Sequence, residues 1–308
     1  MTSVLCVGEC MIELTHIDER TLRRGFGGDT YNTAVYLRRV SAQLGADLDV
    51  GYLSGVGVDH YSDAMRRAWK AESIADRALT VAGRLPGLYT IETSPAGERQ
   101  FTYWRHGSAA GQMFRGNDWI RHVRGDLVHL SGITLQLMSW LSRDALLYRL
   151  HNLRAEGTRI SFDTNYRPRG WASTAEAAAA MDELCEVAHV VFVSREDDEA
   201  LHGARSADEI VARLRKLGAE EVVLRDGAAG AHVIIGDDLE HIPAQPVARV
   251  VDTTGAGDAF AGAYLAARLA GEPPQQAGAV GNAVAAVVIQ HPGALTPIDT
   301  ALVPLSSH

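Results

Sequence analysis

Segments with strand character alternate with segments with helix character along most of this chain. Short apolar runs such as Val4–Gly8 and Leu127–Leu130 are typical of buried strands, while Thr30–Leu44 repeats apolar residues at helical spacing. Repeated alternation of this kind predicts an α/β fold with a doubly wound, mainly parallel central sheet and helices on both faces. Further elements are expected at Leu48–Leu53, Tyr61–Glu72, Ser139–Ala155, Arg159–Asp163, Ser173–Val187, Val190–Val193, Ala207–Leu217, Glu221–Leu224, Asp258–Ala270 and Gln275–Gln290.

Two stretches in the first third contain strand-like pieces with no helix between them. Leu88–Thr93 and Arg99–Trp104 flank a Ser-Pro-Ala-Gly turn, which indicates a β-hairpin. A small β-sheet flap, formed by about residues 11–26 and 84–108, explains these stretches better than extra core strands. We therefore expect a single α/β domain over residues 1–308 that carries this flap.

Composition bounds the class of protein and its compartment. The 308 residues carry a net charge of −9, which argues against a nucleic-acid binder with a basic face. Three cysteines without C-x-x-C spacing fit a reducing cytosol. No signal peptide is recognised, and no apolar run reaches the ~18 residues of a membrane span. We expect a cytoplasmic protein that binds neither nucleic acid nor membrane.

Lysine is scarce, because only two of the 29 basic residues are lysines. No Gly-x-x-x-x-Gly-Lys-[Ser/Thr] string is present, which excludes a P-loop nucleotide site. Any anionic ligand must then be held by arginines, backbone amides or a metal ion. The histidines and cysteines form no cluster with ligand spacing, so no protein-built transition-metal site is expected.

The string Asp252-Thr-Thr-Gly-Ala-Gly-Asp258 carries the strongest functional signal. A glycine-rich turn here runs into the first turn of a helix. Free N–H groups at such a helix start, supported by the helix dipole, can hold a developing anion. Asp258 stands beside them, where a carboxylate can deprotonate a hydroxyl that attacks a phosphoryl group. A plain helix cap is the structural alternative for a bare Gly-x-Gly-Asp.

The longer string, which continues with Ala259 and Phe260, resembles the signature of the ribokinase-like PfkB carbohydrate kinases. The resemblance implies that Asp258 is the catalytic base and that the amides of Gly255, Ala256 and Gly257 form the anion hole. Gly27-Gly-Asp-Thr-Tyr-Asn32 is similar to the N-terminal signature of the same family. It implies that Asn32 contacts the sugar. The residues themselves agree, because Gly28 permits close approach of a polyol and Asp29 and Asn32 offer hydrogen-bonding groups near a helix start.

Within this family, several strings resemble the kinases that act on a sugar acid, 2-keto-3-deoxygluconate. Tyr103-Trp-Arg105 and Asn165-Tyr-Arg-Pro168 are the most specific of them. The resemblance implies transfer of a phosphoryl group from ATP, with Mg²⁺, to the C6 hydroxyl, giving 2-keto-3-deoxy-6-phosphogluconate. An arginine suits the substrate's carboxylate because it donates two parallel hydrogen bonds. The candidate substrate-binding residues are Tyr89, Tyr103, Arg105 and Arg167.

The nucleotide site is less sharply marked. The resemblance implies that it is lined by Asn165, Ser194, Arg225, Gly227, Gly230, Gly255, Gly257 and Asn282. Two positions depart from the family pattern. Many members have Lys where Arg225 stands, and Asn-x-x-Glu where this chain has Ser194-Arg-Glu-Asp197. The resemblance also leaves room for a monovalent cation near Asp252 and for a homodimer or higher homo-oligomer formed through the flap.

Two other functions remain open at this point. A ribokinase-family enzyme that acts on a neutral sugar such as fructose or ribose would share the mechanism, and Arg105 and Arg167 argue against it. A catalytically silent binding protein on the same fold would not need Asp258 and its glycines. A coupled ATPase assay with 2-keto-3-deoxygluconate, fructose and ribose as parallel substrates distinguishes these alternatives.

Overall fold

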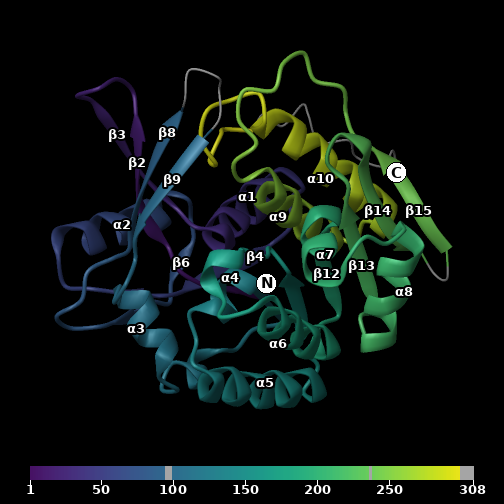
Figure 1. Ribbon diagram of the computed structural model, residues 1–308, viewed down its shortest axis with the longest axis horizontal. Coiled ribbons are helices and arrows are strands. Elements are labelled where there is room, and N and C mark those ends of the chain that lie inside the picture. Colours follow the sequence, from purple (N-terminus) through teal and green to yellow (C-terminus); the bar gives the residue numbers. More distant parts are fainter. Residues whose placement is uncertain (94–98, 236–237, 299–308) are drawn as a thin grey trace.

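A nine-stranded sheet forms the centre of the molecule in a computed structural model, which describes residues 1–93, 99–235 and 238–298. Figure 1 shows this sheet between two layers of helices. Neighbouring strands pair parallel, except that the last two strands along the chain pair antiparallel with each other and with the strand before them. In spatial order they are β15 (Asp238–Pro243), β14 (Gly230–Ile235), β13 (Glu221–Arg225), β12 (Val190–Ser194), β11 (Arg159–Asp163), β10 (Leu127–Ser131), β1 (Thr2–Val7), β4 (Leu48–Leu53) and β6 (Ala75–Asp76).

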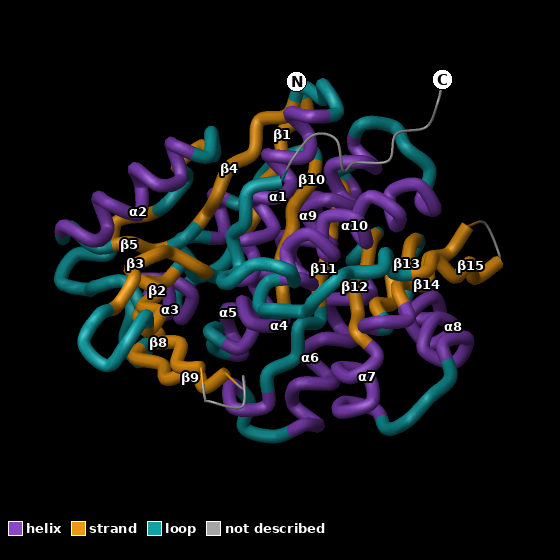
Figure 2. Tube along the Cα trace, turned by 90° about the horizontal axis from the view of Figure 1, so that it is seen from above, coloured by secondary structure: helices purple, strands orange, loops and turns teal. Residues whose placement is uncertain are grey.

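The helices divide between the two faces of the sheet, and each face has its own apolar core. This arrangement, visible from above in Figure 2, confirms the expected doubly wound fold. One face carries α1 (Asp29–Gln43), α2 (His60–Ala71), α9 (Ala256–Leu269) and α10 (Pro274–Val288). The other carries α3 (Ala109–Arg115), α4 (Gly132–Gln136), α5 (Trp140–Ala155), α6 (Thr174–Val187), α7 (Arg195–His202) and α8 (Ala207–Leu217).

Helices α1 and α9 pack unusually closely, and this contact matters for function. The α9 sequence is apolar nearly all round, as expected for a helix buried between neighbours. A Cβ on Gly262 would come within 2.4 Å of the Thr33 carbonyl oxygen, so only glycine allows this approach. The contact brings the first turn of α9 against α1.

A second, four-stranded sheet stands apart from the central one. Its order is β3 (Leu22–Gly27), β2 (Met11–His16), β8 (Leu88–Thr93) and β9 (Arg99–Trp104). Strands β8 and β9 form the predicted antiparallel hairpin, whose turn at 94–97 lies outside the described residues. Strand β2 pairs parallel with β8, and Tyr89, Ile91 and Met11 form a small core on this sheet.

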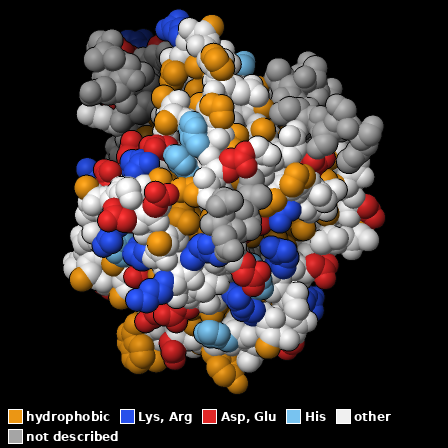
Figure 3. Space-filling view, turned by 90° about the vertical axis from the view of Figure 1, so that its right-hand side faces the viewer, with side chains coloured by type: hydrophobic (Ala, Val, Ile, Leu, Met, Phe, Trp, Pro, Cys, Tyr) orange, Lys and Arg blue, Asp and Glu red, His pale blue; other side chains and the backbone are white. Residues whose placement is uncertain are grey.

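Short elements complete the described chain. Strands β5 (Gly55–Val56) and β7 (Leu79–Thr80) pair with each other, and three 3-10 turns are η1 (Ile120–His122), η2 (Pro168–Gly170) and η3 (Gly227–Ala229). No described helix combines the length and the apolar character needed to cross a membrane. On the face that carries α8 and β15, Figure 3 shows basic and acidic side chains interspersed.

Candidate active site

The glycine-rich turn and the first residues of α9 form the centre of the site. Gly255 is the N-cap and has a φ of +74°, a conformation that L residues rarely adopt. A Cβ at this position would also lie 2.7 Å from the Cβ of Ala294. No hydrogen bond joins the N–H of Gly255 or Gly257 to a described residue, whereas Ala256 N–H donates to the Thr253 carbonyl at 3.2 Å. Two of the three expected amides are therefore free for an anion.

Asp258 lies in the first turn of α9 and faces α1. Asn32 Nδ2 donates a hydrogen bond to Asp258 Oδ2 at 2.8 Å, which orients the carboxylate. Burial, together with the negative charge of Asp29, raises the pKa of Asp258 to about 7, while the Asn32 hydrogen bond opposes this rise. A carboxyl group whose pKa lies near neutrality can accept a proton from a hydroxyl and still be ionised at the start of the reaction.

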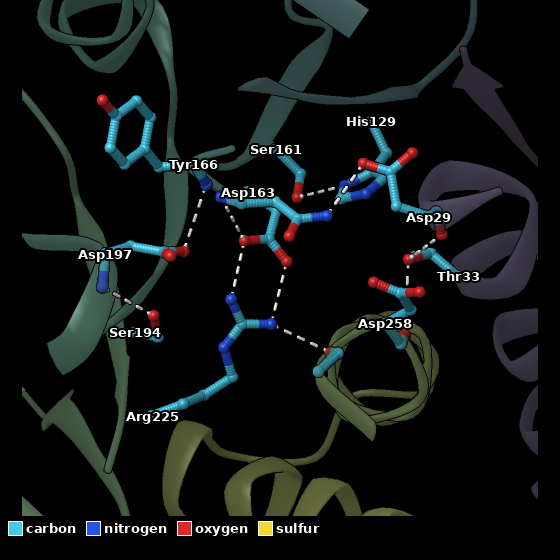
Figure 4. Close-up of polar contacts among 12 residues, drawn as sticks. Asp29, Thr33, His129, Ser161, Asp163, Tyr166, Ser194, Asp197, Arg225 and Asp258 are labelled. Carbon is cyan, nitrogen blue, oxygen red and sulfur yellow. Dashed lines mark hydrogen bonds and ion pairs between the residues drawn. The ribbon is translucent and has the colours of Figure 1, made fainter. Parts of the chain in front are cut away.

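An ion pair behind Asp258 holds α9 to the central sheet. Arg225, at the end of β13, donates to both carboxylate oxygens of Asp163 at 2.7 and 2.8 Å, and to the Gly257 carbonyl at 2.9 Å. Figure 4 shows the guanidinium between the strand ends and the start of α9. Both side chains are largely buried, so the bidentate geometry and the third acceptor are needed to offset desolvation.

Asn165 connects this ion pair to Asp29 at the start of α1. Its Nδ2 donates to Asp29 Oδ2 at 3.0 Å, and its backbone N–H donates to Asp163 Oδ1 at 3.2 Å. Asn165 has a φ of +33°, which is uncommon for a residue other than glycine. Burial raises the pKa of Asp29, and the Asn165 hydrogen bond opposes this rise. Asn165, a candidate for the nucleotide site, thus also contacts Asp29 of the candidate sugar site and lies between the two.

Asp197 lies in the first turn of α7, directly after β12, the strand next to β11 in the central sheet. Ser194 is the N-cap of α7, and its hydroxyl accepts from Asp197 N–H at 3.0 Å. Asp197 Oδ2 accepts from Tyr166 N–H at 3.2 Å, and Oδ1 lies 3.7 Å from Arg167 Nη1. Burial raises the pKa of Asp197. Ser194 therefore positions the acidic residue, and Arg167 lies on this side of the site.

The expected sugar-binding residues gather around the start of α1. Gly28 is the N-cap of this helix, and a Cβ there would lie 2.1 Å from the Glu9 carbonyl oxygen. The buried Asn32 Oδ1 has no hydrogen-bond partner among the described residues, so it can accept from a ligand hydroxyl. The hydroxyl of Tyr89 donates to the Glu13 carboxylate, and the rings of Tyr89 and Tyr103 lie 5.7 Å apart.

Arg105 immediately follows β9 and pairs with a buried carboxylate. Its Nη2 lies 2.5 Å from Glu9 Oε2, and the Glu9 side chain is only 1 % exposed. Ser108, the N-cap of α3, also donates to Glu9. Arg105 Nε is buried without a hydrogen bond to a described residue. The guanidinium is thus anchored through its ion pair with Glu9, and its Nε is left without a described partner.

The remaining nucleotide candidates lie where β14 begins. Gly227 and Gly230 have φ of +53° and +107°, and a Cβ on Gly230 would lie 2.2 Å from the Ile242 carbonyl oxygen. Asn282 Nδ2 donates to the carbonyls of Ile242 and Pro243 at 3.0 and 3.1 Å. The amide of Asn282 thus fastens α10 to β15, which leaves its carbonyl oxygen for other contacts.

Three residues of the site are not among those that the sequence singled out. Asp163 ends a predicted strand, Asp197 lies in the string that departs from the family pattern, and Glu9 follows β1. Each is an acidic residue at the end of an apolar strand or within three residues after it. The ends of parallel strands meet at one edge of a sheet, where ligands bind. The position of these acidic residues at strand ends is therefore the sequence feature that could have identified them.

The described residues do not contain three His, Cys, Asp or Glu side chains grouped to hold a metal ion by themselves. Magnesium needs no such group, because it commonly binds through one or two carboxylates, water and phosphate oxygens. Asp197, whose side chain is 14 % exposed and whose Oδ1 is too far from Arg167 for a hydrogen bond, fits such an ion.

Known proteins are similar to this chain over nearly its whole length. A family model described as pfkB family carbohydrate kinase matches residues 1–301. The 2-dehydro-3-deoxygluconokinase of Escherichia coli (strain K12) is 40 % identical over 309 aligned residues, covering 96 % of this chain and 97 % of that protein.

Solved structures share the fold. A PfkB protein from Polaromonas sp. JS666 has a TM-score of 0.81 and 25 % identity, over 94 % of this chain and 96 % of that one. The aminoimidazole riboside kinase from Salmonella enterica, complexed with aminoimidazole riboside and an ATP analog, has a TM-score of 0.79 and 24 % identity. That similarity covers 98 % of this chain and 96 % of the other.

Proposed function

Because this chain belongs to the pfkB family of carbohydrate kinases, we propose that it phosphorylates 2-dehydro-3-deoxygluconate (2-keto-3-deoxygluconate). It is a phosphotransferase that acts on an alcohol group. The acceptor is the C6 hydroxyl, the donor is ATP, and the product is the 6-phosphate of the same sugar acid. The full-length similarity to a 2-dehydro-3-deoxygluconokinase supports the choice of substrate.

The observation that carries the mechanism is the environment of Asp258. Its carboxylate is oriented by Asn32, has a pKa near neutrality and lies beside the free amides of Gly255 and Gly257. In this proposal, Asp258 accepts the proton of the C6 hydroxyl as its oxygen attacks the γ-phosphorus. The amides stabilise the negative charge on the transferring phosphoryl group.

Arg225 has a positioning role in this proposal. Its hydrogen bond to the Gly257 carbonyl ties the anion-hole turn to Asp163. A lysine has no planar fork and could not make the same bidentate contact. Arg225 thus retains the positive charge that many family members provide with lysine and adds a fixed orientation.

We assign the nucleotide to the carboxyl edge of the sheet, near Ser194, Asn165, Gly227 and Gly230. Asp197 would hold Mg²⁺ there together with phosphate oxygens. The bound ion would supply charge neutralisation of the phosphates. A monovalent cation near Asp252 stays a prediction.

The acid end of the sugar lies toward the second sheet in this proposal. Arg105 and Arg167 provide cationic groups for the carboxylate, while Asp29, Asn32 and Tyr103 offer hydrogen bonds to the hydroxyls. The second sheet would act as a flap whose closure excludes water and limits hydrolysis of ATP. Self-association through this sheet and a cytoplasmic location are part of the same proposal.

The variant Asp258→Asn tests the proposed base. We expect turnover with 2-dehydro-3-deoxygluconate to fall by about 10²–10⁴-fold, while calorimetric titration still detects ATP binding. Asp208→Asn, which neutralises an exposed carboxylate on α8, is the matched control and should turn over normally. Turnover near the wild-type rate in Asp258→Asn would refute the assignment.

A further inference from the structure

Helix α1 holds a further segment of the chain besides α9. This segment, residues 293–298, follows α10 and has no regular secondary structure. Three side chains of α1 at helical spacing, Tyr36, Arg39 and Gln43, donate hydrogen bonds to its backbone at 2.8, 2.8 and 3.2 Å. The acceptors are the carbonyls of every second residue, Ala294, Thr296 and Ile298. One face of α1 thus fixes the 293–298 segment along its length.

The Tyr36 hydroxyl makes two contacts with this segment. It donates to the Ala294 carbonyl at 2.8 Å and accepts from the Thr296 N–H at 2.8 Å. Tyr36 is fully buried, so solvent cannot replace either partner. Burial raises the pKa of Tyr36 to about 12, so the hydroxyl keeps its proton and donates to Ala294 at neutral pH.

Ala294 lies directly against the glycine-rich turn. A Cβ on Gly255 would come within 2.7 Å of the Ala294 Cβ and within 3.1 Å of the Ala294 carbonyl oxygen, which is the oxygen that accepts from Tyr36. The preceding residue, Gly293, donates its N–H to the Asp252 carboxylate at the start of the same turn. The proposed anion hole therefore packs on a segment whose position depends on Tyr36.

The same face of α1 also orients the proposed base. Asn32, one turn before Tyr36, donates to the Asp258 carboxylate, and Thr33 Oγ1 donates to the Asp258 carbonyl at 3.3 Å. Residues four apart lie on one face of a helix, so Asn32 and Tyr36 lie on the same side of α1. The negative charge of Asp258 also adds to the rise in the pKa of Tyr36 that burial causes. One helix thus contacts the base and, through the 293–298 segment, the turn beside it.

We infer that Tyr36 is a positioning residue for the anion hole. Its hydroxyl holds Ala294, and Ala294 in turn supports Gly255 in the conformation that leaves the Gly255 N–H free for the transferring phosphoryl group. This inference rests on the proposed function, because it assigns Tyr36 to the anion hole of that reaction. Since an anion hole acts mainly on the transition state, its displacement lowers kcat and leaves the affinity for substrates nearly unchanged.

The test is Tyr36→Phe, which keeps the ring and removes only the hydroxyl. We expect kcat for the sugar acid to fall about tenfold or more, and KM for the sugar acid and for ATP to stay within about twofold of the wild-type values. Calorimetric titration with ADP and Mg²⁺, with and without aluminium fluoride, gives a second readout that needs no turnover. Aluminium fluoride takes the place of the transferring phosphoryl group, so the affinity that it adds to ADP should fall by a similar factor, while ADP alone binds normally.

Two further variants separate this role from a general loss of stability. Gln43→Ala removes the hydrogen bond at the far end of the same segment and should keep the wild-type kcat. Ala294→Gly keeps Tyr36 and removes the methyl group that packs on Gly255, so it should lower kcat as Tyr36→Phe does. If Tyr36→Phe does not fold, Ala294→Gly decides the test.

A folded Tyr36→Phe or Ala294→Gly variant with kcat within about twofold of the wild type overturns the inference. An equal loss of affinity for ADP with and without aluminium fluoride, or an equal loss of kcat in Gln43→Ala, overturns it as well. A wild-type enzyme that phosphorylates fructose or ribose and not the sugar acid refutes the proposed substrate alone, because the variants are then compared on that acceptor. A wild-type enzyme that transfers phosphate to none of the three refutes the proposed function, and this inference with it.

Discussion

The pH dependence of the reaction tests the role of Asp258 through two of its neighbours. Asn32 donates to the Asp258 carboxylate at 2.8 Å and lowers its pKa, whereas the negative charge of Asp29 raises it. Asn32→Ala removes the donor and should raise the pKa of Asp258. Asp29→Asn removes the repulsion and should lower it. The two substitutions therefore move one titration in opposite directions.

The expected magnitude follows from the contacts. A hydrogen bond to a charged group contributes about 1.5–3 kcal/mol, and one pKa unit corresponds to 1.36 kcal/mol. Loss of the Asn32 contact should thus move the pKa of Asp258 from about 7 upward by about one to two units. Because the base must be ionised, activity is lost as the pH falls through this pKa, so the acidic limb of the profile shifts with it.

The assay is kcat/KM for the sugar acid as a function of pH, since this quantity reports the ionisation of the free enzyme. Both variants change a candidate sugar contact, so the position of the limb is compared and not its height. Asn152→Ala, on α5, is a control whose limb should match that of the wild type. Shifts of the two variants in the same direction, or a wild-type profile without an acidic limb near neutrality, would refute the reasoning.

Three further predictions concern stability and the anion hole. The pKa of Asp258 is raised in the folded state, so its ionisation lowers the stability of the fold as pH rises from about 4 to about 7. Asp258→Asn should therefore raise the Tm above pH 7 and leave it unchanged below pH 4. An equal Tm change at both pH values would contradict this. Gly255→Ala should reduce the free energy of unfolding by about 1–2 kcal/mol, because φ is +74° and Ala294 is close. It should also lower kcat on the order of tenfold or more, because the anion-hole amides would shift. A kcat equal to that of the wild type would argue against the role of this turn as an anion hole. Arg225→Leu strands the buried Asp163 charge and should reduce the free energy of unfolding in urea by about 3–5 kcal/mol; an unchanged midpoint would show that this pair is dispensable.

The central fold could be predicted from local patterns, and the exceptions have physical reasons. Strands such as β4 and β11 match their expected bounds because a buried parallel strand is a short apolar run between turns. Helix α7 was not predicted, because its eight residues are mostly polar and show no apolar repeat at helical spacing. Its N-cap Ser194 stabilises it together with three acidic residues in its first turn, which favour the positive end of the helix dipole.

Part of the candidate site could likewise be predicted from the sequence, and part could not. The turn before α9 and Asp258 lie in one continuous string, so the chemistry of that string could be inferred from the residues and the resemblance. The pairing of Arg225 with Asp163, and of Arg105 with Glu9, joins segments far apart in the sequence. Such partners depend on strand order and on the packing of the second sheet, which no local pattern encodes.

The most direct test of the account is a coupled assay of ATP consumption with three acceptors offered in parallel. Purified enzyme, ATP and Mg²⁺ are combined with 2-dehydro-3-deoxygluconate, fructose or ribose, and kcat/KM is measured for each. We predict that the sugar acid exceeds both neutral sugars by at least about a hundredfold. A value for fructose or ribose equal to or above that for the sugar acid would contradict the account.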